Sequence, residues 1–139
     1  MKLLDAHLLA QETDRWTEIL FRALSNRVAK RWRFVSFRGK GRGEWRGIVD
    51  VLAIRKNTSL PTNLGLKRGD LFDIILIQMK GGSARTPSMA EKRRLQAVAK
   101  HHGAREVVLF EWKRGRGTAL YTLSKTLEWH PSTRRGLFG

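Results

Sequence analysis

The clearest alternation of side chains along the chain lies in residues 73–80, which read Asp-Ile-Ile-Leu-Ile-Gln-Met-Lys and precede two glycines. Because side chains alternate between the two faces of a strand, Gln78 and Lys80 share one face and Met79 points to the other. Both faces are apolar over most of this length, which is typical of a central strand covered on both sides. An amide and an ammonium near the end of such a strand indicate a functional site.

The segments around this strand predict an α/β fold. Residues 5–30 form an amphipathic helical pattern, whose apolar positions are Leu9, Trp16, Ile19, Leu20, Ala23, Leu24 and Val28. Residues 33–38 and 45–54 have strand character and form a predicted hairpin. A capping-box pattern of Ser88 with Glu91 begins a second helix, which Gly103 ends. Two last strands are predicted over 107–112 and 119–123.

The resulting order, α-β-β-β-α-β-β, predicts one domain over residues 1–139, with a central mixed β-sheet flanked by helices. A chain of this length can bury a core of its own. The segment 129–139 contains Pro131 and two adjacent arginines. We expect this C-terminal tail to be flexible.

The chain is strongly basic, with 28 Lys and Arg against 12 Asp and Glu and a formal net charge of +16. This charge indicates a polyanionic partner, because each neutralised phosphate releases condensed counterions, but it does not distinguish DNA from RNA. No apolar run approaches the ~20 residues that span a bilayer, and no signal-peptide pattern begins the chain. The absence of cysteine excludes disulfides and thiolate metal sites. We expect a cytoplasmic protein without membrane contact.

A carboxylate, Asp50, interrupts the apolar segment 47–54, Gly-Ile-Val-Asp-Val-Leu-Ala-Ile. Burying a carboxylate is costly unless a cation pairs with it. Consecutive strands are usually neighbours, so we expect Asp50 beside Gln78 and Lys80. One carboxylate and one amide oxygen suit Mg²⁺ or Mn²⁺. Lys80 would orient or help to deprotonate an attacking water, or stabilise charge on a phosphate.

These residues resemble the PD-(D/E)xK nuclease superfamily, which has the restriction-endonuclease-like αβββαβ core. The family pattern is a helix bearing Glu, an Asp on the second strand, (D/E)-x-K on the third strand, and a helix. The matching segments here are Gly47-Ile-Val-Asp50 and Gln78-Met79-Lys80, and the resemblance spans residues 12–112. In size and order the chain is similar to archaeal-type Holliday-junction resolvases. In its Gln-x-Lys it is similar to Mrr-type restriction nucleases.

The resemblance implies the roles of the strand residues. Asp50 would be a metal ligand and Lys80 the catalytic lysine. Gln78 would bind the metal through its amide oxygen, and the Met79 backbone carbonyl would be a further ligand. Gln78 is neutral where the family usually has an acid, which weakens metal binding.

The helix acid of the family has two candidates. Glu18 lies at the usual distance before the first strand and at the margin of the apolar stripe, whereas Glu12 lies within the stripe. We favour Glu18 as the catalytic and metal-binding residue, and its alternative role is an ion pair with Arg22 at i+4. Asp73 is a competing acid near Gln78. Its odd position places it on the opposite face of the strand.

For polar residues outside this cluster, the sequence allows two roles each. Gln96 on the second helix is either a supporting polar residue, as in related nucleases, or an ordinary surface residue. The glycine-rich turns 39–43 and 115–117 either contact phosphate or are ordinary exposed turns. The expected nucleic-acid-binding residues are Arg38, Lys40, Arg42, Arg46, Arg85, Lys113, Arg114 and Arg116.

The sequence therefore predicts a Mg²⁺-dependent endodeoxyribonuclease that hydrolyses double-stranded or branched DNA, in a resolvase-like or restriction-like manner. The alternative, which the neutral Gln78 favours, is a nuclease-fold protein that binds DNA or RNA without cutting it. A resolvase that cuts two strands symmetrically needs two sites, so a homodimer is expected for that function.

Overall fold

The structure, a computed structural model, describes residues 17–27, 31–37, 47–82, 85–113 and 115–139. Its centre is one mixed six-stranded sheet in the order β1-β2-β3-β4-β5-β6. Residues 17–26 are helical and are called the first helix below. The other elements are β1 (Arg33–Ser36), β2 (Val51–Lys56), β3 (Phe72–Gly81), α2 (Met89–His102), β4 (Glu106–Lys113), β5 (Gly117–Leu123), β6 (Trp129–Ser132) and α3 (Arg134–Phe138).

The predicted central strand is β3, which pairs antiparallel with β2 and parallel with β4. Its alternation is as the sequence predicts. Ile75 and Ile77 belong to one core cluster, and Leu76 belongs to the cluster on the other face. A parallel neighbour requires a crossover connection, and α2 provides it between β3 and β4.

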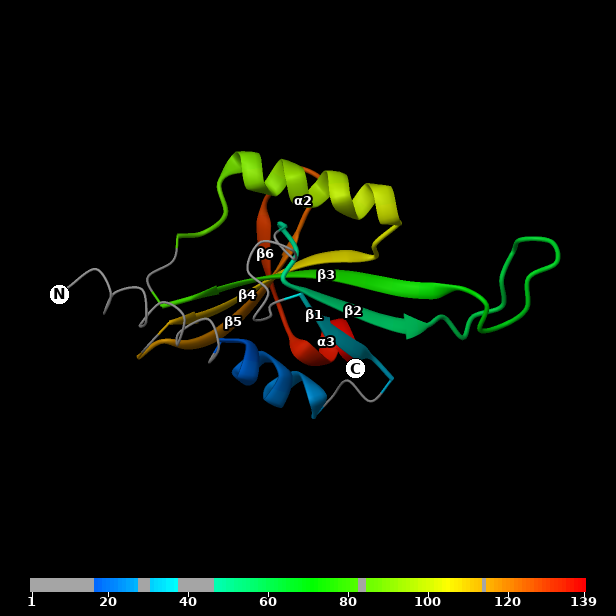
Figure 1. Cartoon of the computed structure of the whole chain (residues 1–139), viewed down its shortest axis with the longest axis horizontal. Helices are drawn as coiled ribbons and strands as arrows, with labels where there is room; N and C mark the ends of the chain where they lie inside the picture. The colour runs from blue at the N-terminus through cyan, green and yellow to red at the C-terminus, as the bar shows by residue number, and fades with distance from the viewer. Residues whose placement is uncertain (1–16, 28–30, 38–46, 83–84, 114) are drawn as a thin grey trace.

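Helices cover both faces of the sheet (Figure 1). On one face α2 packs Leu95 against Leu76 and Val107. On the other face the first helix and α3 contribute Phe21 and Phe138 to the larger core cluster. No helix in the described part of the chain is both long enough and apolar enough to cross a bilayer.

Both predicted ends of α2 are confirmed. The Ser88 side chain accepts the Glu91 amide at 3.2 Å, and Glu91 Oε1 accepts the Ser88 amide at 3.3 Å, which completes the capping box. Gly103 has φ of 64° at the C-terminal end, in the left-handed region that glycine adopts without a Cβ penalty. Local sequence signals therefore fix where this helix begins and ends.

The segment 129–139, for which the sequence predicts a flexible tail, contains a strand and a short helix. Strand β6 pairs with β5 along its length, and α3 begins at Thr133, whose side chain accepts the Gly136 amide. Phe138 is only 2% exposed and contacts the Trp32 ring edge-on at 5.8 Å. Phe138 thus attaches the end of this segment to the core, whereas its flexibility stays a prediction.

Candidate functional site

Asp50 lies where β2 and β3 stop pairing regularly. Val51 pairs with Ile77, and the Asp50 amide also donates to the Ile77 carbonyl at 3.0 Å. Two residues of one strand therefore face one residue of the other, the arrangement of a β-bulge, which redirects a side chain. Asp50 Oδ2 accepts the Met79 amide at 2.8 Å, where a regular ladder would supply a carbonyl. This hydrogen bond holds the Asp50 carboxylate against the end of β3.

Gln78 and Lys80 lie on the face of β3 that α2 covers. Leu76 packs against α2, and the two-residue period places Gln78 and Lys80 on the same side. Gln78 is only 5% exposed, and its Oε1 is buried without a hydrogen-bond partner among the described residues. The Lys80 side chain is 25% exposed, and its Nζ lies 3.8 Å from Glu91 Oε2. A buried acceptor without a donor is costly, so this amide oxygen has the capacity to bind a cation.

Glu91, in the first turn of α2, is a second carboxylate at this end of β3. The Ser88 backbone amide is the largest cause that lowers the pKa of Glu91 below its usual value, and burial opposes it. The Lys80 ammonium and the side chains of Gln78 and Ser88 lower the pKa of Glu91 further. Glu91 is therefore ionised at neutral pH.

Sequence reasoning assigned Glu91 to the capping box alone and missed its contact with Lys80. A signal for it was present. The helix that follows a site strand packs on one face of that strand, so an acid in its first turn lies above the strand's end. Strand alternation indicated Gln78 and Lys80, and the apolar segment around Asp50 indicated that carboxylate, whereas Glu91 required this tertiary step.

The candidate helix acid Glu18 pairs with Arg22, at 3.7 Å between Glu18 Oε1 and Arg22 Nε. This is the alternative role that the i+4 spacing allows. Its side chain is 19% exposed, beside the buried Thr17 and Phe21 of the same helix. Whether Glu18 also binds a metal stays a prediction. Glu12 lies outside the described residues.

Asp73 has a role at the opposite end of β3. Its carboxylate accepts hydrogen bonds from Arg55 Nε at 2.9 Å and Asn57 Nδ2 at 3.1 Å. Arg105 Nη1 lies 3.6 Å from the same carboxylate. In the pairing of β2 with β3, Asp73 lies opposite Arg55, whereas Ile77 lies opposite Val51, the residue that follows Asp50. Four residues of strand, roughly 13 Å, therefore separate Asp73 from the Asp50 end.

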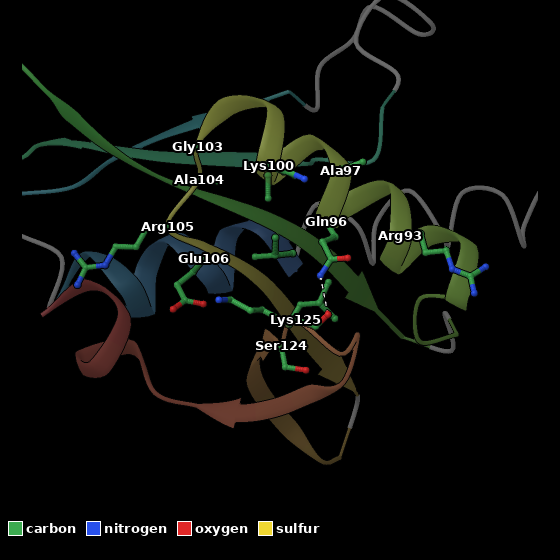
Figure 2. Close-up of a pocket in the computed structure, with 13 residues that line it drawn as sticks. Arg93, Gln96, Ala97, Lys100, Gly103, Ala104, Arg105, Glu106, Ser124 and Lys125 are labelled. Carbon is green, nitrogen blue, oxygen red and sulfur yellow. Dashed lines mark hydrogen bonds between the residues drawn. The ribbon is translucent and has the colours of Figure 1, made fainter.

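A basic hollow lies between α2 and the turn that joins β5 to β6 (Figure 2). Its volume is about 790 Å³. Gln96 Nε2 donates to the Lys125 carbonyl at 3.1 Å beside it, as the dashed line in Figure 2 shows. Gln96 thus connects α2 to this turn. The charged residues that line the hollow are Arg93, Lys100, Arg105, Glu106 and Lys125.

Of the predicted nucleic-acid-binding residues, Arg85, Lys113 and Arg116 are described. Trp112 pairs with Gly81, so the turn that follows β4 lies at the same end of the sheet as Lys80. The Arg116 amide donates to the Lys113 carbonyl at 2.9 Å in this turn. Arg85 and Arg116 are exposed. The other predicted residues, Arg38, Lys40, Arg42, Arg46 and Arg114, lie outside the described part of the chain.

The oxygen donors at this end of β3 fit Mg²⁺ or Mn²⁺. The Asp50 carboxylate is held by the Met79 amide, and Gln78 Oε1 has no hydrogen-bond partner in the part of the chain that the structure describes. Hard divalent ions of this kind take carboxylate and amide oxygens and keep several waters. Within the described ranges, no group of three or more His, Cys, Asp or Glu side chains could hold a metal. An ion here would therefore rely on the Gln78 amide as well as on carboxylates.

Among solved structures, the chain is similar to a Holliday junction resolvase of Archaeoglobus fulgidus, an archaeal hyperthermophile. The TM-score is 0.50 at 14% sequence identity, over 85% of this chain and 86% of that chain. The chain has the restriction-endonuclease-like fold. The predicted fold class, a mixed sheet flanked by helices, is thereby confirmed. No protein-family model and no curated protein matches the sequence.

Proposed function

We propose that the protein is a Mg²⁺- or Mn²⁺-dependent endonuclease that hydrolyses DNA phosphodiester bonds. The observation that carries this proposal is the meeting of Asp50 with the Gln78–Lys80 end of β3, within a restriction-endonuclease-like fold. The net charge of +16 supports a polyanionic substrate.

The side chains of this cluster have distinct tasks in the proposed reaction. A divalent ion bound by Asp50 and Gln78 would supply an activated water and neutralise phosphate charge. The Met79 amide fixes the Asp50 carboxylate, so its orientation is set before substrate arrives. Lys80 places its ammonium beside the same strand end, where it would stabilise charge that develops on the phosphate. Its pairing with Glu91 keeps this ammonium oriented.

Branched DNA is the proposed substrate class. The structural neighbour from Archaeoglobus fulgidus is a Holliday junction resolvase, which supports a junction over a linear duplex. Symmetrical cutting of a junction needs two sites, and a homodimer would supply them.

A cleavage assay tests this function. The full chain would be incubated with a labelled four-way junction and a linear duplex of the same sequence, with Mg²⁺, with Mn²⁺ or with EDTA. We expect cleavage that needs the metal and is faster for the junction. Equal cleavage of both substrates would contradict the proposal that branched DNA is the substrate, but it would still support the proposal that the protein is a nuclease.

A second candidate function is DNA or RNA binding without cleavage. The neutral Gln78, at a position where related nucleases carry an acid, favours it. This candidate predicts salt-sensitive binding that neither metal nor Asp50→Ala alters. Binding of this kind together with no cleavage in Mg²⁺ or Mn²⁺ would contradict the endonuclease proposal.

The basic hollow beside α2 should contribute phosphate contacts. No ion pair is seen for Lys100 or Lys125 within the described ranges, so both charges are available to a polyanion. We expect Lys100→Ala with Lys125→Ala to reduce the slope of log K against log salt concentration by about 2, one for each lost phosphate contact. Fluorescence anisotropy with labelled DNA measures this slope.

A matched double variant controls for loss of net charge. Lys67→Ala with Arg68→Ala removes two cations from the exposed loop between β2 and β3. This variant should change the salt slope less than the variant of the hollow. Equal changes in the two double variants would show that only net charge matters.

A further inference from the structure

The carboxylate of Glu91 lies beside Lys80, at the polar end of β3. Its Oε1 accepts the Ser88 amide at 3.3 Å, and its Oε2 lies 3.8 Å from Lys80 Nζ. The side chain is 33% exposed, so solvent and ions reach it. A carboxylate has about four lone-pair sites, and these two contacts leave capacity for another partner.

Gln78 leaves this end of β3 short of negative charge. Asp50 supplies one carboxylate against the strand, and Gln78 supplies a buried neutral oxygen that has no donor among the described residues. Divalent ions in oxygen sites are usually held by one or two carboxylates. With Gln78 neutral, Asp50 is the one carboxylate that this end of the β2–β3 pair supplies within the described residues, and a second one would come from another element.

The packing of α2 brings that carboxylate to the correct face. Gln78 and Lys80 lie on the α2 side of β3, and Glu91 belongs to the first turn of α2. Glu91 Oε2 lies 3.8 Å from Lys80 Nζ, and Lys80 follows Gln78 by two residues on this face of β3. Asp50 just before β2, Gln78 on β3 and Glu91 on α2 are thus three oxygen-bearing residues from segments that meet at this end of β3.

We propose that Glu91 is the second acidic ligand of the divalent cation, and that it replaces the charge that Gln78 does not carry. This inference rests on the proposed metal-dependent function. Asp50 and Glu91 then each contribute a negative charge, and Gln78 contributes its amide oxygen. Because Lys80 contacts Glu91, its ammonium would lie close to the same ion.

Mn²⁺ binding to the full chain, measured by isothermal titration calorimetry without DNA, tests this role. Glu91→Gln should weaken Mn²⁺ binding about tenfold or more, the size of effect seen when metal-site groups are removed. Glutamine serves in a capping box as glutamate does, so α2 keeps its first turn. Addition of Gln78→Glu to Glu91→Gln should restore Mn²⁺ affinity to within about threefold of the wild-type value, because the charge returns on β3.

Ser88→Ala is the matched control. It breaks the same capping box but leaves the Glu91 carboxylate in place, so Mn²⁺ affinity should stay within about twofold of the wild-type value. Equal losses in Ser88→Ala and Glu91→Gln would overturn the inference, since helix capping would then explain both. Wild-type affinity in Glu91→Gln would also overturn it.

The inference and the proposed function can fail separately. If Asp50→Asn loses Mn²⁺ binding and Glu91→Gln keeps it, the metal site stands and Glu91 has no part in it. If the wild-type chain binds no Mn²⁺, both the inference and the metal-dependent function are overturned.

Discussion

Replacement of Lys80 by methionine should lower the rate of the proposed DNA cleavage about 10²–10³-fold, the usual cost of removing one group that stabilises transition-state charge. Methionine keeps an unbranched side chain of similar length and removes only the ammonium. DNA affinity should change little, because one cation among 28 Lys and Arg is lost. Single-turnover cleavage at saturating enzyme, with anisotropy for affinity, separates the two quantities.

Lys67→Met is the matched control for Lys80→Met. Lys67 is exposed in the loop between β2 and β3, at the opposite end of these strands from Asp50. It should cleave at the wild-type rate. A Lys80→Met protein that binds DNA and cleaves it at the wild-type rate would remove Lys80 from the proposed chemistry.

Replacement of Phe21 by alanine should lower the free energy of unfolding by about 3–5 kcal/mol. Phe21 is fully buried, and its ring makes edge contacts with Phe34 and Phe110, each at 5.2 Å, and with Phe138 at 6.1 Å. The variant loses the buried apolar area and these ring contacts and leaves a cavity between the first helix and the sheet. Denaturation by urea, followed by circular dichroism, measures the change.

Phe72→Ala provides the comparison for Phe21→Ala. Phe72 has the same side chain but is 58% exposed at the start of β3. Its replacement should change the free energy of unfolding by about 0.5 kcal/mol or less. Similar losses for the two phenylalanines would contradict the assignment of Phe21 to the core.

The elements with local signals could be predicted from the sequence. The continuous apolar run of β3 indicated a central strand, and its two-residue period separated Gln78 and Lys80 from Met79. Ser88 with Glu91 and the later Gly103 bounded α2, because capping is decided within a few residues. These features depend on near neighbours in the chain.

The face of the first helix could not be predicted in the same way. The apolar pattern placed Ile19 in the buried stripe, yet Ile19 is 46% exposed. The buried positions described are Thr17, Phe21 and Ser25, which follow one another at four-residue spacing. Two small polar residues flank the aromatic ring, so a count of apolar residues did not detect this face.

Features that depend on long-range pairing were also beyond the sequence. Phe138 at the end of the segment 129–139 contacts the rings of Phe21, Phe34 and Trp32, which lie more than 100 residues earlier in the chain. The bulge at Asp50 arises from the register of β2 on β3, which no local pattern specifies. The register of β2 on β3 therefore determines which backbone group of β3 the Asp50 carboxylate contacts.

The most direct measurement of the central claim is the anomalous X-ray signal of a crystal of the full chain soaked in Mn²⁺. We predict a single strong peak at the end of β3, roughly 2.0–2.2 Å from oxygens of Asp50, Gln78 and Glu91. A peak that contacts Asp50 and Gln78 but not Glu91 would support the proposed metal site and would show that Glu91 is not one of its ligands. No peak near Asp50 and Gln78, at a Mn²⁺ concentration that supports cleavage, would contradict the metal site.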